Sequence, residues 1–274
     1  MIAGSRRGLA VVGGGKIGEA LLAGLVRQAG SGAGIWVVER SPQRAAELAA
    51  RYGVGTVDLA EAAAHARVLL LAVKPQDVDA LLALLAPHVA ADAHLVVSVA
   101  AGVPTARIEA ALPAGTPVVR VMPNTPALVD AGMSVLSAGA HATEEHLDEA
   151  EALLAPVGRV QRVPESQQDA VTALSGSGPA YFFFLVEAMI DAGILLGLPR
   201  SLAADLIVQT AYGSAVMLRD SGEHPVQLRE AVTSPGGTTI AAIRELERHG
   251  VRAALIAAIE AAHQRSVELG RPQD

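Results

Sequence analysis

Short apolar runs alternate with longer amphipathic stretches over the first 160 or so residues. The runs are apolar throughout rather than at every second position, which is typical of strands covered on both faces of a parallel sheet. They predict strands at residues 9–12, 35–38, 68–73, 95–99 and 118–122, with weaker candidates at 133–136 and 159–163. Helices are predicted between them, at residues 17–27, 42–51, 76–85 and 105–111, and from the capping residue Thr143 to about Pro156. The pattern indicates an α/β fold with a doubly wound, Rossmann-type parallel sheet.

After about residue 164 the strand pattern stops and only helical stretches follow. They lie at residues 179–196, 201–220, 225–232, 239–248 and 251–269. The segment from Tyr181 to Val186 is apolar on every side of a helix, so such a helix must be covered all round. Because about 110 residues supply too little chain for that cover, we expect a second subunit to provide it; burial against the first domain alone is the alternative. We therefore predict two domains, residues 1–164 and an all-helical domain at residues 165–274.

Composition disfavours several classes of protein. Of the 274 residues 51% are hydrophobic, and the net charge of −7 disfavours nucleic acid, whose phosphates require a basic surface. The chain has no cysteine, and its eight histidines show no metal-binding spacing, so we expect neither thiolate chemistry nor a metal site. The N-terminus lacks the apolar core of a signal peptide, and Glu187 and Asp191 interrupt the most apolar stretch. We expect a cytoplasmic protein without a membrane span.

A glycine-rich turn joins the first predicted strand to the first predicted helix. Its sequence, Gly-Gly-Gly-Lys-Ile-Gly from Gly13, matches the G-x-G-x-x-G pattern in that position. Gly13 would permit the tight turn, Gly15 would let the backbone approach a pyrophosphate, and Gly18 would let the helix pack closely on the strand. The N–H groups and dipole of a helix N-terminus favour negative charge. We therefore expect this turn, with Lys16 and Ile17, to bind a dinucleotide.

The end of the second predicted strand carries two conflicting signals for the choice of cofactor. An acid such as Glu39 is typical of proteins that bind the ribose 2′-hydroxyl of NAD, whereas Arg40 and Ser41 suit the 2′-phosphate of NADP. The phosphate can be held there if Glu39 turns away. We predict NADPH as the cofactor, with NADH as the alternative.

Residues that follow the apolar runs are candidates for contact with the cofactor, because ligands of doubly wound sheets lie beyond the carboxyl ends of the strands. Lys74, one of only two lysines in the chain, follows the third run, and Pro123 and Pro126 fix the backbone after the fifth. A solvated lysine and a plain strand exit are the alternatives. The predicted contacts are Ala72, Val73, Lys74, Pro75, Ala100, Met122, Pro123 and Asn124.

Two further segments combine glycines with hydroxyl groups where helices are predicted to begin. In the segment that starts at Ser175, Ser177 can cap a helix and Pro179 fits its first turn. The segment Ser-Pro-Gly-Gly-Thr-Thr, from Ser234 to Thr239, offers a cradle of N–H donors that can bind a carboxylate without an arginine. A two-glycine turn with a threonine cap is the alternative for the second segment.

These motifs resemble pyrroline-5-carboxylate reductase over nearly the whole chain, and the segment at Ser234–Thr239 is the most specific of them. The resembling stretches are residues 13–18, 72–75, 98–102, 120–126, 175–181, 222–225 and 228–247. The resemblance implies reduction of the imine 1-pyrroline-5-carboxylate to L-proline by NAD(P)H, the last step of proline biosynthesis. It also implies a dinucleotide-binding Rossmann domain and a helical domain for substrate binding and homodimer formation, with dimers that assemble into decamers. Many members carry an asparagine before the third strand, where this chain reads Gly-Thr-Val-Asp-Leu from Gly55.

Carried over residue by residue, the resemblance implies two sets of contacts. The substrate would be held by Ser234, Gly237, Thr238 and Thr239, with Pro179 and Ala180 near its ring. The nicotinamide would be bordered by Met122, Pro123 and Asn124. Because a cyclic imine is basic enough to arrive protonated, its reduction needs positioning more than a strong acid. Thr239 would then be a catalytic hydroxyl that hydrogen-bonds the imine nitrogen and not an essential acid.

Two other functions stay open at this point. A 3-hydroxyacid dehydrogenase shares the plan of a Rossmann domain followed by helices, but it would need a lysine on the first long helix of the second domain, where none is present. A non-catalytic sensor or scaffold would bind NADP without turnover.

Overall fold

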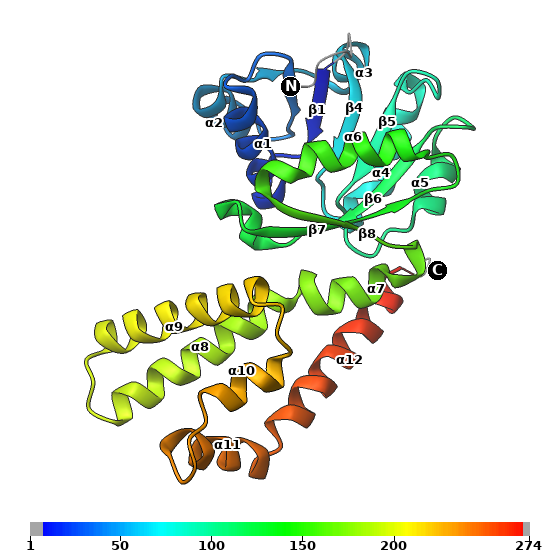
Figure 1. The fold of residues 1–274 in the computed structure, drawn as a ribbon. Helices are drawn as coiled ribbons and strands as arrows, with labels where there is room; N and C mark the ends of the chain where they lie inside the picture. Colours follow the sequence, from blue (N-terminus) through cyan, green and yellow to red (C-terminus); the bar gives the residue numbers. More distant parts are fainter. Residues whose placement is uncertain (1–7, 271–274) are drawn as a thin grey trace. The chain divides into compact units, whose positions relative to one another are not determined.

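The computed structural model describes residues 8–270, which divide into two compact units (Figure 1). Within this range, residues 8–177 and 262–270 form the sheet unit, and residues 178–261 form the helical unit. The sequence pattern predicts a domain boundary at residue 164, where the strand pattern stops, and this boundary remains a prediction. By compactness, the segment from residue 165 to residue 177 belongs with the sheet, to which Gln168 is hydrogen-bonded at the carbonyl of Val135.

The sheet unit contains one eight-stranded sheet in the order β3-β2-β1-β4-β5-β6-β7-β8. The strands are β1 (Gly8–Val12), β2 (Ile35–Val38), β3 (Gly55–Thr56), β4 (Ala66–Leu71), β5 (Leu95–Ser98), β6 (Val118–Met122), β7 (Gly132–Ala138) and β8 (Gly158–Arg162). The six strands from β3 to β6 in this order are parallel, as predicted. The predicted parallel sheet has one exception at its edge, where β7 pairs antiparallel with β6 and β8 follows the direction of β7.

Helices cover both faces of the sheet and enclose two layers of apolar side chains (Figure 1). One face is covered by α1 (Lys16–Ala29), α2 (Pro42–Tyr52) and α6 (Glu144–Leu154), and the other by α3 (Leu59–His65), α4 (Val78–Leu85) and α5 (Thr105–Ala111). Successive residues of β1 alternate between the layers, with Leu9 and Val11 in one and Ala10 and Val12 in the other. This double burial explains why the strands are apolar at every position.

The sequence pattern does not predict β3 and α3, and it places one strand too late. α3 has seven residues and begins with a capping box between Asp58 and Glu61, a spacing that is visible in the sequence. The third predicted strand, at residues 68–73, is β4 at Ala66–Leu71, so Ala72 and Val73 belong to the loop that follows it. The helix predicted at residues 76–85 begins as a 3₁₀ turn, Pro75–Asp77, before α4.

The helical unit comprises four whole helices and most of a fifth. They are α8 (Gly178–Leu195), α9 (Arg200–Asp220), α10 (Pro225–Ala231), α11 (Thr238–Arg248) and α12 (Val251–Leu269), whose last turns belong to the sheet unit. α8 packs on α9 where Gly193 faces Ala203. Of residues 178–261 only Gly178 and Ala203 are buried, and Phe182, Phe183 and Phe184 are 63%, 68% and 71% exposed. The unit therefore has almost no core within a single chain.

Two helical stretches of the described residues, 165–195 and 200–220, are long and apolar enough to cross a membrane by length and composition alone. The expectation that Glu187 and Asp191 exclude a span was therefore too strong, since both lie in the first stretch. Core helices of soluble proteins pass the same test, so the finding does not itself indicate a membrane.

Candidate active site

The carboxyl ends of the parallel strands bring the predicted cofactor residues of the sheet unit to one edge. Gly13 follows β1 and donates its N–H to the carbonyl of Val38 at the end of β2 (2.9 Å). Ala72 follows β4 and donates to the carbonyl of Val12 (2.8 Å). The strand order reverses direction between β1 and β4, which is the point where doubly wound sheets bind ligands. The glycine turn and the loop from Ala72 to Pro75 therefore meet at the expected place.

The three glycines of the motif have different surroundings. Gly13 has φ of +105°, and a Cβ there would lie 2.6 Å from the carbonyl oxygen of Ala72. A Cβ on Gly18 would overlap the carbonyl oxygen of Gly13. Gly15, by contrast, has no atom within 4 Å of the place of its Cβ, and α1, which starts directly after it, has no side-chain cap. Gly13 and Gly18 are thus required for packing, while Gly15 leaves open space before an uncapped helix N-terminus, which fits a bound diphosphate.

Glu39 points into the glycine turn. One carboxylate oxygen accepts the N–H of Gly14 at 2.7 Å, and the other accepts the N–H of Ser41 at 3.0 Å. A 2′-phosphate is predicted to bind here if Glu39 turns away. In this structure Glu39 is turned inwards, because the N–H groups of Gly14 and Ser41 hold it. An acid in this position suits a ribose hydroxyl.

Arg40 and Ser41, the predicted phosphate-binding pair, are engaged elsewhere. The guanidinium of Arg40 is 85% exposed and lies 3.4 Å from the carboxylate of Asp77. The hydroxyl of Ser41 caps α2 by accepting the N–H of Arg44 at 3.3 Å. Arg40 is a surface side chain that can swing toward a ligand, since exposed ion pairs of this kind contribute little energy.

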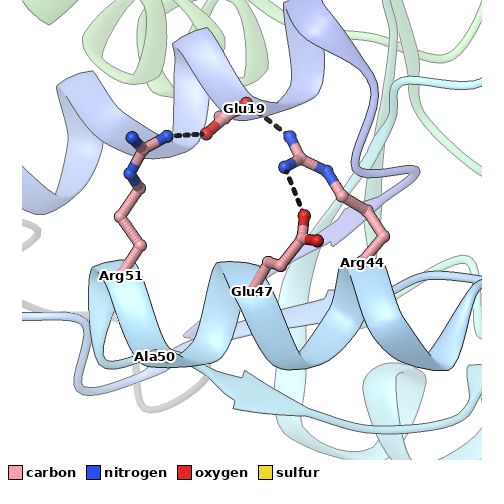
Figure 2. Close-up of a pocket in the computed structure, with 5 residues that line it drawn as sticks. All are labelled: Glu19, Arg44, Glu47, Ala50 and Arg51. Atoms are coloured by element: carbon pink, nitrogen blue, oxygen red, sulfur yellow. Dashed lines mark hydrogen bonds and ion pairs between the residues drawn. The ribbon is translucent and has the colours of Figure 1, made fainter.

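Arg44 supports the glycine turn, although the sequence pattern does not predict it as a site residue. Its Nε donates to the carbonyl of Gly14 at 3.0 Å, and its guanidinium also pairs with Glu19 of α1 and Glu47 of α2. Figure 2 shows the hollow between these helices, where Glu19 also binds Arg51. Burial alone would raise the pKa of Glu19, but hydrogen bonds from Arg44, Arg51 and the hydroxyl of Tyr52 lower it below its usual range. The charges in this hollow neutralise one another, so it supports the turn and is not itself a site.

The remaining strand-end residues lie around the same edge. Lys74 is exposed, and its side chain does not cap the 3₁₀ turn that follows it. Lys16 is exposed in the first turn of α1. Ala100 is buried after β5, and its N–H is hydrogen-bonded to the hydroxyl of Ser98 (3.3 Å). Their contacts with a cofactor remain predictions.

The loop after β6 contacts the segment at Ser175, which joins two motifs far apart in the sequence. The Nδ2 group of Asn124 donates to the carbonyl of Ser175 at 3.1 Å. Its Oδ1 accepts the N–H of Met133 at 2.9 Å. A Cβ on Gly176 would overlap the methyl group of Met122, so the glycine permits a close approach.

α8 begins at Gly178, directly after Ser177 and one residue before the predicted start at residue 179, but the backbone of Ser177 is itself helical. Residues Thr172–Gly176 form a π-helical turn, hereafter the π turn, between α7 (Gln168–Val171) and α8. The N–H of Ser177 donates to the carbonyl of Thr172 at 2.8 Å, so the helical path continues through the glycines. Gly176, the last residue of the π turn, leaves the space in which Met122 packs against it.

The segment at Ser234 lies within the helical unit as a tight turn before α11. Gly236 has φ of +68°, and the N–H of Gly237 donates to the carbonyl of Ser234 at 3.1 Å. Gly237 is the N-cap of α11, no side chain caps this helix, and the hydroxyl of Ser234 lies directly over Gly237. Thr238 and Thr239 therefore offer their N–H groups and hydroxyls at a helix N-terminus, which suits a carboxylate. In the single chain Thr238 and Ala180 are exposed, whereas Thr239 and Pro179 are half-buried.

Comparison with family models matches both parts of the chain. A model described as "Pyrroline-5-carboxylate reductase dimerisation" matches residues 165–269. A model described as "NADP oxidoreductase coenzyme F420-dependent" matches residues 8–102.

Individual proteins match over nearly the whole length. Pyrroline-5-carboxylate reductase of Mycobacterium tuberculosis is 49% identical, with 95% of this chain and 96% of that protein covered. The same enzyme of Methanosarcina acetivorans is 42% identical, with 95% and 97% covered. Among solved structures, the reductase of Coxiella burnetii has a TM-score of 0.91 at 37% identity, with 98% and 100% covered. That of Plasmodium falciparum, solved with NADP bound, has a TM-score of 0.87 at 28% identity, with the same coverage. The chain belongs to the pyrroline-5-carboxylate reductase family.

Proposed function

We propose that this chain reduces 1-pyrroline-5-carboxylate to L-proline with NADPH as the preferred cofactor. The observation that carries the proposal is its near-complete match to reductases named for that substrate. The uncapped N-terminus of α1 behind Gly15 supports the nucleotide part, as does the NADP bound to the Plasmodium falciparum relative. When bound, NADPH would supply the hydride for the imine carbon. Oxidation of NADPH that requires added pyrroline-5-carboxylate tests this; binding of NADPH without oxidation would indicate a sensor instead.

The chain's own residues would bind and orient the two reactants. Gly13 to Gly18, with Lys16 and Ile17, would hold the diphosphate at the start of α1. Arg40 and Ser41 would approach the adenosine end. At the other strand ends Ala72 to Pro75, Ala100 and Met122 to Asn124 would border the cofactor.

The substrate would be bound by the turn before α11. Its carboxylate would lie against Gly237 and accept the N–H groups of Thr238 and Thr239 and the hydroxyl of Ser234. Pro179 and Ala180 would border its ring. No lysine is present on α8, and the only lysines of the chain are Lys16 and Lys74. A substrate that arrives protonated needs no strong acid, and the hydroxyl of Thr239 would orient its ring nitrogen. This argues against the 3-hydroxyacid dehydrogenase alternative, which needs a lysine there.

Thr239→Ala is expected to lower kcat by a moderate factor, at most the 10²–10³-fold that is typical of one polar transition-state contact. The Kd of NADPH should stay unchanged. Steady-state kinetics and a titration with NADPH check both values. Thr210→Ala is the matched control, because the Thr210 hydroxyl bonds only the Leu206 carbonyl within α9 among the contacts described (2.7 Å). A loss of about five orders of magnitude with intact NADPH binding would instead make Thr239 an essential acid.

Glu39→Gln is expected to shift the cofactor preference toward NADPH. The carboxylate now held by Gly14 and Ser41 would repel a 2′-phosphate, whereas a glutamine keeps an acceptor without the charge. The ratio of kcat/KM for NADPH to that for NADH should rise about tenfold, which corresponds to about 1.4 kcal/mol. Glu47→Gln removes one charge from α2, the helix that follows Glu39, and should leave the ratio unchanged. An unchanged ratio in Glu39→Gln would mean that Glu39 does not set the preference.

A homodimer would provide the missing cover of the helical unit. Residues 178–261 expose most of their apolar side chains in the single chain, and the matching family model is one of dimerisation. A second subunit accounts for this exposure without a membrane. We also propose that the dimers assemble into decamers and that the protein is cytoplasmic. A measurement of its mass in solution tests the assembly.

A further inference from the structure

The helical path from α7 into α8 contains one π turn, at Thr172–Gly176. π turns are rare, and they often occur at functional sites. A sharp irregularity in a helix commonly has a local cause such as a proline. Here the cause lies in the sequence that follows the turn.

Pro179 removes a donor that a regular helix would supply. Proline has no N–H, so the carbonyl of Ser175, four residues earlier, cannot receive the usual helical hydrogen bond. The hydroxyl of Ser175 cannot substitute, since it donates to the carbonyl of Val171 at 3.1 Å. The Nδ2 group of Asn124 instead donates to the Ser175 carbonyl at 3.1 Å. An amide from the loop after β6 thus takes the place of the missing backbone donor.

The two elements joined by this bond are each fixed to the sheet. Asn124 is oriented by the N–H of Met133, which donates to its Oδ1 at 2.9 Å. Gln168 anchors α7 just before the π turn, because its amide donates to the carbonyl of Val135 (3.1 Å) and to the hydroxyl of Ser137 (2.8 Å). The carbonyl of Ser175 therefore lies between two rigid supports, and Asn124 is its partner.

We propose that Asn124 is a positioning residue for the reduction, because it holds the π turn against the end of β6. The backbone held in this way leads directly to Pro179 and Ala180, which border the substrate ring in the proposed function, and the inference rests on that proposal. Asn124 acts through the carbonyl of Ser175. The effect of Asn124 on the reaction should therefore depend on residue 179 having no N–H that could bond the same carbonyl.

A double-mutant cycle between Asn124→Asp and Pro179→Ala tests this coupling. Aspartate keeps the acceptor for the Met133 N–H but has no donor for the Ser175 carbonyl at neutral pH. Pro179→Ala introduces a backbone N–H that can bond that carbonyl as in a regular helix. We expect Asn124→Asp alone to lower kcat/KM for pyrroline-5-carboxylate at least tenfold. The double variant should be at least tenfold more active than the product of the two single effects. Effects that multiply within about twofold would overturn the inference.

Hydrogen exchange of the peptide at residues 172–178 gives a readout that is independent of activity. We expect faster exchange in Asn124→Asp, and exchange restored toward the wild-type rate in the double variant. Asn124→Ala loses the contact with the Met133 N–H as well. If that variant does not fold, Asn124→Asp still provides the test. Unchanged exchange in Asn124→Asp would overturn the inference. A wild-type protein that does not reduce pyrroline-5-carboxylate would overturn the proposed function, while exchange would still decide whether Asn124 holds the turn.

Discussion

Arg120→Met is expected to lower the free energy of unfolding by about 3 kcal/mol, the largest loss of stability among the substitutions considered for this chain. Arg120 lies in β6 with its side chain only 6% exposed, and it donates to the carboxylate of Glu165 at 3.2 Å. Methionine has a similar length but leaves that carboxylate without its cation. Removing one partner of a buried pair typically costs 3–5 kcal/mol, and the lower figure applies because Glu165 is 27% exposed.

The effect should be large because Arg120 joins several segments of the sheet unit. Glu165 also accepts the N–H and hydroxyl of Thr105, at 2.7 and 2.5 Å, at the start of α5. The second Nη of Arg120 lies 3.9 Å from Asp169 of α7, which in turn accepts the hydroxyl of Ser266 near the end of α12 at 2.7 Å. This polar cluster therefore joins β6 to two segments of the sheet unit, the one before the helical unit at α7 and the one after it at the end of α12.

Urea unfolding at a fixed protein concentration would measure the loss, since the stability of an oligomer depends on concentration. Arg265→Met is the matched control, because Arg265 is 66% exposed and pairs with Glu268 on the same helix. Such surface pairs contribute at most about 0.5 kcal/mol. If Arg120→Met were as stable as this control, the cluster would not hold the segments together.

Strands buried on both faces were predictable, because their sequence must be apolar throughout. The strands at residues 35–38 and 118–122 were predicted with the bounds that the structure gives to β2 and β6. The antiparallel direction of β7 could also be predicted from the sequence. The loop from β6 to β7, residues 123–131, holds no long helix, and a parallel connection needs a dozen or more residues.

The site was predictable only where a residue's role follows from the local backbone. Gly13 and Gly18 could be assigned from the motif, since a tight turn and a close helix require glycine there. The contacts of Asn124 and Arg44 could not, because each side chain binds backbone groups brought near by the fold, 51 residues away for Asn124 and 30 for Arg44. The inward position of Glu39 depends likewise on an N–H of Gly14, 25 residues away. Such bonds leave no periodic pattern in the sequence.

Gly15→Ala and Gly18→Ala are both expected to impair NADPH binding strongly, but for different reasons. Their comparison separates a glycine needed by the ligand from one needed by the fold. A Cβ on Gly15 meets no atom of the chain within 4 Å, so the variant should unfold at the same temperature as the wild type within about 2 °C. It should still raise the Kd of NADPH at least a hundredfold, because the methyl group would occupy the space that a diphosphate needs in order to reach the N-terminus of α1.

Gly18→Ala should lose both stability and binding. Its Cβ would overlap the carbonyl of Gly13, and neither backbone can yield without separating α1 from β1. We expect a loss of about 2–3 kcal/mol, in the range typical of overpacking, together with a loss of detectable NADPH binding. Thermal unfolding and a titration with NADPH measure both properties in the two variants. If Gly15→Ala bound NADPH as the wild type does, the diphosphate could not lie against Gly15, and the open space at the glycine turn would not be the nucleotide site.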